Sequence, residues 1–141
     1  MAREGAHSRS RVLHAGGDST GKEILRTLYE QAGTEPNIHF QSLAAVNDLL
    51  LRDGKISGAI AFDRKSRKRV QIRARVVLLA TGGAGQVYLN TTNPHVATGD
   101  GIGMAYRAGA EIADVEFIQF HPTALFIPGR PRFLLSEALR G

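Results

Sequence analysis

The chain has 141 residues, 43% of them hydrophobic and 22% charged, which is typical of a globular protein and excludes a disordered chain. The formal net charge is +5 and cysteine is absent, so this chain supplies no disulfide, iron–sulfur ligand or thiol nucleophile. No apolar run approaches the ~20 residues that span a bilayer, and the polar first residues lack a signal-peptide core, so we expect no membrane segment and a cytoplasmic location.

The first third of the chain predicts one short strand and one helix. Residues 11–15 form the strand candidate, which leads into the turn-forming stretch 16–21 with several possible N-caps. From Lys22 onward, apolar residues recur at three- and four-residue spacing, which predicts an amphipathic helix. Gly33 stands where a helix C-cap is expected.

A small meander of antiparallel strands is predicted next. The β-rich runs cover residues 38–40, 43–51, 56–62 and 70–74. Residues 52–55, Arg-Asp-Gly-Lys, are typical of a hairpin turn. The basic cluster at residues 64–69 contains no aromatic residue for base stacking. We interpret this cluster as the next solvated turn and expect no nucleic acid partner, although a positive field would also favour anionic ligands.

The central feature of the sequence is the apolar run at residues 76–80, which is followed at once by Thr81-Gly82-Gly83. This pattern predicts a short strand buried on both faces that ends in a tight loop. Loops of this kind line ligand crevices in α/β sheets, because glycine lets backbone N–H groups approach a ligand. By itself, the pattern fits a plain turn equally well.

Residues 98–101, Thr-Gly-Asp-Gly, predict the start of a short helix over 102–107 that ends near Gly109. Asp100 can cap this helix through its side chain, a contribution of ~1 kcal/mol. The same helix N-terminus would also favour a bound phosphate.

The rest of the chain predicts less regular structure. Residues 111–114 and 116–120 are short extended runs, and Pro122 keeps His121 out of the helical region. An irregular loop at 126–132 and the start of a helix at 133–141 follow.

Four motifs in this order and spacing resemble the flavoprotein family of succinate dehydrogenase, fumarate reductase and L-aspartate oxidase. They are Ala80-Thr81-Gly82-Gly83, Thr98-Gly99-Asp100-Gly101, Gln119-Phe120-His121-Pro122-Thr123 and Ser136-Glu137-Ala138-Leu139-Arg140-Gly141. The resemblance implies an α/β fold with α+β elements. Residues 1–120 would form part of a Rossmann-like FAD-binding domain with an antiparallel meander, and residues 121–141 would begin a substrate-capping domain.

Three features favour the L-aspartate oxidase branch. Residues 3–15 are similar to that branch's stretch before an Asp-x-Thr-Gly turn, here residues 18–21. The dehydrogenases usually lack a glutamate in the place of Glu4. Their loop after His-Pro-Thr is also Gly-rich, whereas this chain has residues 124–125, Ala-Leu, and 131–134, Pro-Arg-Phe-Leu.

This resemblance implies oxidation of L-aspartate to iminosuccinate by non-covalently bound FAD, the first step of bacterial de novo NAD biosynthesis. Dioxygen or fumarate would reoxidise the flavin, and quinolinate synthase would take the product. Two alternatives stay open. One is a succinate dehydrogenase or fumarate reductase flavoprotein subunit, and the other is a non-catalytic module that binds a nucleotide or a partner protein.

The resemblance also implies roles for individual residues. His121 would contact a substrate carboxylate, and Thr123 would bind the same ligand or only cap the turn. Glu4 would recognise the α-amino group of aspartate, which succinate lacks. Near the end of the chain, the Ser136 hydroxyl would bind a carboxylate, while a proton relay would include Glu137 and Arg140. For FAD, the implied contacts are the backbone of Ala45 and Val46 toward adenine, and Ala80, Thr81, Gly82 and Asp100 elsewhere along the cofactor.

Several parts of the family pattern do not occur in this chain. The Gly-x-Gly-x-x-Gly fingerprint that holds the FAD pyrophosphate is absent, as are the proton-exchanging arginine and the later residues that clamp the second carboxylate. We therefore expect an internal piece of a longer protein that is inactive by itself. No His, Cys or Asp cluster has metal-ligand spacing, so we predict no metal.

Overall fold

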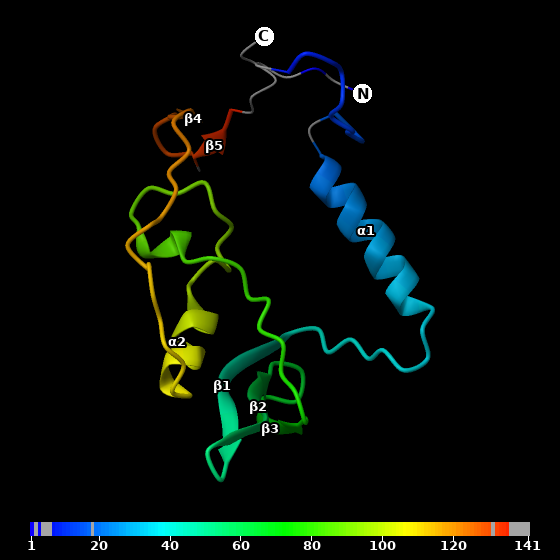
Figure 1. The fold of residues 1–141 in the computed structure, drawn as a ribbon, viewed down its shortest axis with the longest axis vertical. Helices are drawn as coiled ribbons and strands as arrows, with labels where there is room; N and C mark the ends of the chain where they lie inside the picture. The colour runs from blue at the N-terminus through cyan, green and yellow to red at the C-terminus, as the bar shows by residue number, and fades with distance from the viewer. Residues whose placement is uncertain (2, 4–6, 18, 131, 136–141) are drawn as a thin grey trace. The chain divides into compact units, whose positions relative to one another are not determined.

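The computed structural model describes residues 1, 3, 7–17, 19–130 and 132–135 (Figure 1). The chain divides into two compact units. The first comprises Met1–Phe40, Thr123–Leu125 and Phe133–Gly141, and the second comprises Gln41–Pro122 and Phe126–Arg132. This division does not test the predicted domain limits of 1–120 and 121–141, which stay a prediction. Among the described residues, no helix is long and apolar enough to cross a membrane.

The first unit is built on helix α1, Thr20–Gly33, which confirms the amphipathic helix predicted from Lys22. Its C-cap is Thr34 in the αR conformation, one residue beyond the predicted cap at Gly33. The Tyr29 ring packs on Phe40 with 4.6 Å between centroids. Residues 38–40 nevertheless form no strand, and the strand predicted at 11–15 is reduced to an isolated bridge residue, Val12.

The first unit also contains a short pair of strands that the sequence did not predict. Strand β4, Ala124–Leu125, pairs antiparallel with β5, Phe133–Leu134. The Leu135 N–H donates to the Thr123 carbonyl at 3.2 Å. Strands this short carry no alternating pattern, and β5 replaces the first residues of the helix predicted at 133–141. The rest of that prediction, from residue 136, lies outside the described residues.

In the second unit, the three-stranded antiparallel sheet confirms the predicted meander, in the order β1-β2-β3. The strands are β1, Ala44–Arg52, β2, Lys55–Asp63, and β3, Lys68–Arg73. Asp53 and Gly54 join the first two strands with φ of 52° and 72°. Positive φ at both central residues defines a type I′ turn, which matches the twist of a hairpin.

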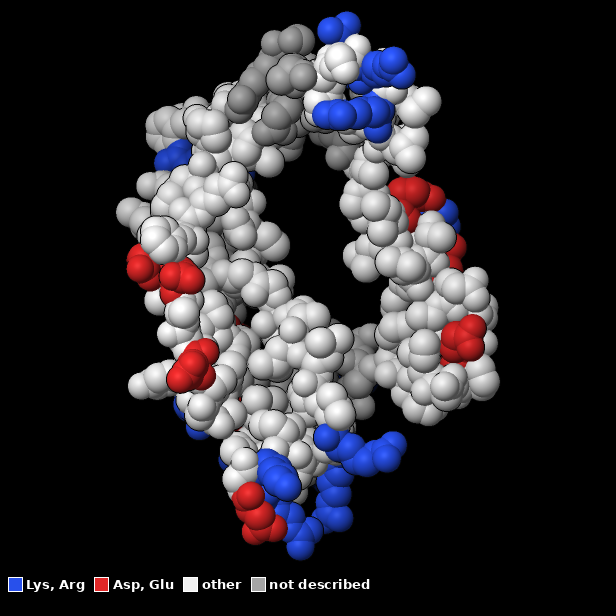
Figure 2. All heavy atoms as spheres, in the orientation of Figure 1, with Lys and Arg blue, Asp and Glu red and all other residues white. Residues whose placement is uncertain are grey.

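The basic cluster forms the second turn of the sheet, as predicted. The Asp63 carboxylate accepts hydrogen bonds from the Lys65 N–H at 3.0 Å, the Ser66 N–H at 3.3 Å and the Ser66 hydroxyl at 2.7 Å. These bonds hold the turn closed while its Lys and Arg side chains stay exposed. Figure 2 shows Lys and Arg side chains gathered in the region of the three-stranded sheet.

Helix α2, Asp100–Arg107, follows the second Gly-rich segment and confirms the short helix predicted there. Its N-cap is Gly99 in the left-handed region, with φ of 78° and no side-chain cap. The predicted capping role of Asp100 is therefore wrong, because Asp100 is already the first helical residue. Met104 of this helix is 1% exposed and is the largest fully buried side chain among the described residues.

The buried strand predicted at residues 76–80 is the main correction. These residues form no strand, and Val76 and Leu78 are 81% and 88% exposed. A strand buried on both faces needs neighbouring strands and covering layers, and no described residue pairs with this run. The extended runs predicted at 111–114 and 116–120 are also irregular, with a turn after Asp114, whose φ is 60°.

Candidate functional site

Two Gly-rich segments of the second unit meet at the start of α2. The Gly99 N–H donates to the Gly83 carbonyl at 3.1 Å, and the Gln86 N–H donates to the Ala97 carbonyl at 2.9 Å. Gly101 is buried, and a Cβ at this position would overlap the Thr81 hydroxyl. The loop after residue 80 therefore packs directly against the helix N-terminus, which brings predicted cofactor residues from both motifs together.

The backbone of the first Gly-rich segment is open on one side. A Cβ placed on Gly82 or Gly83 would meet no atom within 4 Å. Asp100 is exposed in the first turn of α2. A ligand can therefore reach the open side of this backbone, the helix N-terminus, which attracts negative charge, and an exposed carboxylate, which accepts hydrogen bonds from hydroxyl groups.

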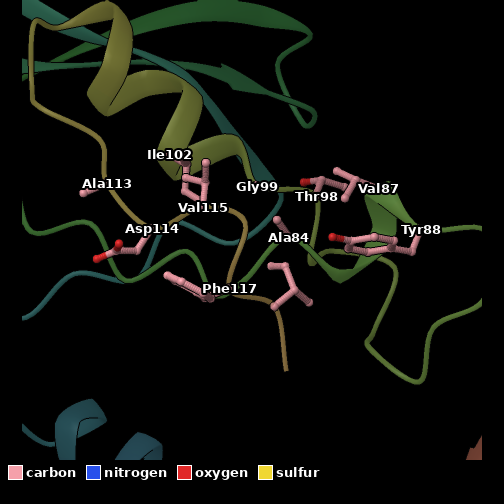
Figure 3. Close-up of a pocket in the computed structure, with 11 residues that line it drawn as sticks. Ala84, Val87, Tyr88, Thr98, Gly99, Ile102, Ala113, Asp114, Val115 and Phe117 are labelled. Atoms are coloured by element: carbon pink, nitrogen blue, oxygen red, sulfur yellow. The ribbon is translucent and has the colours of Figure 1, made fainter. Parts of the chain in front are cut away.

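A pocket of about 500 Å³ lies beside this junction (Figure 3). Its wall is mostly apolar and includes Val87, Tyr88, Ile102 and Phe117, together with Gly99 of the helix cap. The size and apolar wall fit a small-molecule site with few polar contacts.

A second pocket of about 490 Å³ lies between residues 86–95 and 126–132. Arg132 is held there by two contacts. Its guanidinium lies 3.8 Å from the Phe126 ring centroid and donates to Asn90 Oδ1 at 2.8 Å. The Gln86 amide, also in the pocket wall, donates to the carbonyls of Asn93 and Pro94 at 2.9 and 3.2 Å.

The predicted adenine-end residues lie on β1. Ala45 and Val46 pair with Phe62 and Ala61 of β2. A side-chain contact then joins β1 to α2, because Arg107 Nε donates to both Asp48 carboxylate oxygens, at 3.4 and 3.2 Å. This hydrogen bond lowers the pKa of the Asp48 carboxyl from its ordinary value.

A family model described as an FAD binding domain matches residues 1–141. The chain belongs to the FAD-binding domain family. The exposed backbone at Gly82 and Gly83, the α2 N-terminus and the Asp100 carboxylate fit FAD, which carries a pyrophosphate and several hydroxyl groups. The structure therefore brings the predicted cofactor residues Thr81, Gly82 and Asp100 together in one place.

The chain is homologous to L-aspartate oxidases over its whole length. It is 46% identical to the enzyme of Yersinia pestis over 100% of the chain and 28% of that protein. It is 51% identical to the enzyme of Nostoc sp. over 98% of the chain and 24% of that protein. A chloroplastic L-aspartate oxidase of Nicotiana tabacum is 47% identical over 100% of the chain and 24% of that protein. The chain thus spans about a quarter of the length of these relatives.

Solved flavoprotein structures have a matching fold. A quinol fumarate reductase from E. coli, with an E245Q mutation in its FrdA chain, has a TM-score of 0.88 at 40% identity, over 99% of this chain and 23% of that one. The Mycobacterium smegmatis Sdh1 complex has a TM-score of 0.81 at 36% identity, over 98% of this chain and 25% of that one. The mixed α/β fold with its antiparallel sheet therefore matches part of a fumarate reductase flavoprotein.

The predicted substrate residues are only partly described. His121 and Thr123 are half-buried, whereas Glu4, Ser136, Glu137 and Arg140 lie outside the described residues. No group of three or more His, Cys, Asp or Glu that could hold a metal occurs in the described part of the chain. The sequence did not predict the contacts of Arg107 and Gln86. The partners of Arg107 are distant along the chain, and those of Gln86 are backbone carbonyls, which leave no sequence pattern.

Proposed function

We propose that this chain is part of an FAD-dependent L-aspartate oxidase, which oxidises L-aspartate to iminosuccinate. The whole-length match carries the proposal, since L-aspartate oxidases from bacteria and tobacco are 45–51% identical over 98–100% of the chain. Because the chain spans about a quarter of these relatives, the activity would belong to a longer protein. The 141 residues alone would be inactive.

In this protein, residues 1–120 would contribute to a Rossmann-like FAD-binding domain and residues 121–141 would begin the substrate-capping domain. The TM-score of 0.88 against a fumarate reductase flavoprotein supports this assignment. The FAD would be bound non-covalently. Ala45 and Val46 would contact its adenine end, and Ala80, Thr81, Gly82 and Asp100 would lie along the rest of the cofactor.

The substrate would be held by groups that complement two carboxylates and one ammonium group. His121, Thr123 and the Ser136 hydroxyl would donate hydrogen bonds to carboxylate oxygens, and Glu4 would accept from the α-amino group. Glu137 and Arg140, three positions apart in the sequence, would belong to a proton relay.

These residues would act mainly by orientation. Bound FAD supplies the hydride acceptor, and the protein fixes the substrate so that its Cα hydrogen faces the flavin. Correct positioning can supply ~7–11 kcal/mol of such a barrier. Dioxygen or fumarate would be the electron acceptor, quinolinate synthase would take the product, and the protein would work in the cytoplasm.

A second candidate is the flavoprotein subunit of a succinate dehydrogenase or fumarate reductase. The likeness to the quinol fumarate reductase and Sdh1 structures, at 40% and 36% identity, favours it. The two candidates differ in whether the substrate carries an amino group. Glu4 supports the oxidase, because a carboxylate facing succinate would have no cation to pair with.

Steady-state turnover of the full-length protein distinguishes the two candidates. Purified protein would be saturated with FAD and supplied with L-aspartate or succinate, each with dioxygen or an artificial redox dye as acceptor. We expect turnover of L-aspartate and none of succinate. Turnover of succinate with no turnover of L-aspartate would refute the proposal and support the second candidate.

A further inference from the structure

Strand β1 contains a bulge next to the residues proposed to meet adenine. Val46 pairs with Ala61 and Asp48 pairs with Ile60, so Asn47 is an extra residue without a partner on β2. A bulge bends its strand and redirects the neighbouring residues. The position of Val46 therefore depends on what holds the bulge.

Arg107, at the end of α2, holds this bulge with a single guanidinium. Its Nη2 donates to the Asn47 carbonyl at 3.0 Å, and its Nε donates to the Asp48 carboxylate at 3.2 and 3.4 Å. The planar guanidinium can serve both partners at once, which an ammonium group cannot do with the same geometry. Among the ion pairs of the described residues, this one alone joins elements far apart in the sequence.

The contribution of this ion pair to stability should be small. The Arg107 and Asp48 side chains are 52% and 40% exposed, and exposed ion pairs contribute little because water and salt screen them. The Asn47 carbonyl, by contrast, belongs to the backbone, so the bond from Arg107 restrains the bulge directly. Such a bond constrains geometry even where it adds little stability.

The opposite end of α2 is fixed as well. Gly99 bonds to Gly83, and Gly101 packs on Thr81 without room for a side chain. Since α2 has eight residues, it is a rod about 12 Å long at ~1.5 Å per residue. This rod connects the bulge of β1 at one end to the Gly-rich segment at the other, within one compact unit.

We propose that Arg107 is a positioning residue for FAD, which holds the bulge of β1 at a fixed distance from the Gly-rich start of α2. This inference rests on the proposed function, in which the adenine end of FAD meets Ala45 and Val46 and another part meets Thr81 to Asp100. A ligand that touches both places depends on their spacing. A ligand that touches only one place does not.

The test compares FAD with its two halves, AMP and FMN, in the full-length protein. Dissociation constants would be measured by calorimetry for the native protein, Arg107→Gln, Arg107→Lys and Asp48→Asn. We expect Arg107→Gln to weaken FAD binding about tenfold, a loss of ~1.4 kcal/mol, and to change AMP and FMN binding less than about twofold. Arg107→Lys can pair with Asp48 but cannot also hold Asn47 in the same geometry, so its loss should be intermediate.

Arg26→Gln is the matched control. Arg26 pairs with Glu23 and Glu30 within α1, far along the chain from the proposed FAD contacts, so the same substitution there should leave all three affinities unchanged. Equal losses for FAD and AMP in Arg107→Gln, or no loss at all, would overturn the inference. Should that variant fail to fold, the same comparison in Asp48→Asn decides it. Failure of the native protein to bind FAD would instead refute the proposed function.

Discussion

Thr81 and Gly101 lie so close together that a Cβ on residue 101 would overlap the Thr81 hydroxyl. Glycine in a helix costs roughly 0.5–1 kcal/mol relative to alanine, and at residue 101 this cost permits direct contact between two Gly-rich segments. The contact fixes the loop after residue 80 against the N-terminus of α2, where the proposed FAD contacts converge.

Substitution Gly101→Ala should separate these segments. We expect a loss of stability of about 1–3 kcal/mol, as in other overpacked sites, together with weaker FAD binding. The thermal midpoint and the FAD dissociation constant of the full-length protein would measure both effects. Gly33→Ala is the control, because a Cβ there meets no atom within 4 Å. It should be neutral or stabilising, and equal losses in the two variants would contradict the packing explanation.

Low pH should weaken the hydrogen bonds that two carboxylates of the sheet accept. Hydrogen bonds from Arg107 and Ser66 lower the pKa of the Asp48 and Asp63 carboxyls, respectively. A lowered folded-state pKa stabilises the fold at pH values above the unfolded-state value, about 4, and this stabilisation is lost as pH falls through the lowered pKa. As the pH falls from neutral to below the lowered pKa, the urea midpoints of unfolding of the native protein and of Asp48→Asn should therefore converge. Midpoints that keep a constant separation would contradict this linkage.

Substitution Glu4→Gln tests the proposed recognition of the amino group. A hydrogen bond to a charged group contributes about 1.5–3 kcal/mol, so kcat/KM for L-aspartate should fall roughly 10- to 150-fold. FAD affinity should not change. Steady-state kinetics would measure the first and calorimetry the second. An unchanged kcat/KM for L-aspartate would show that Glu4 does not bind the amino group.

Substitution His121→Ala tests the proposed carboxylate contact. We expect kcat/KM for L-aspartate to fall by about 10- to 150-fold, the range for a charged hydrogen bond, with FAD binding retained. His95→Ala is the control, since His95 is an exposed histidine of the second unit. A similar loss of activity in both variants would mean that His121 has no specific role.

Local patterns predicted the parts of the fold whose causes are local. The Asp53-Gly54 turn needs residues that tolerate positive φ, and α1 follows from its spacing of apolar residues, so both could be found in the sequence. The run at 76–80 could not be placed correctly, because its apolar residues need neighbouring strands that the described residues do not supply. Strands β4 and β5 were missed because each has only two residues.

The candidate site likewise contains residues that could be predicted from the sequence and residues that could not. Thr81, Gly82 and Asp100 could be predicted from two Gly-rich motifs, and the structure brings them together. Arg107 could not, because its partner Asp48 is 59 residues away and the bulge that creates its second contact depends on strand register. Sequence patterns indicate which backbone segment a ligand can approach. They do not indicate which side chain holds the bulge of β1 at its distance from the start of α2.

Anaerobic reduction of the bound flavin is the most direct test of the central claim. The full-length protein, loaded with FAD and freed of dioxygen, would be mixed with L-aspartate or with succinate while the visible absorption of oxidised flavin is followed. We expect L-aspartate to bleach the flavin and succinate to leave it oxidised. Bleaching by succinate, with no response to L-aspartate, would contradict the assignment and place this protein with the dicarboxylate dehydrogenases.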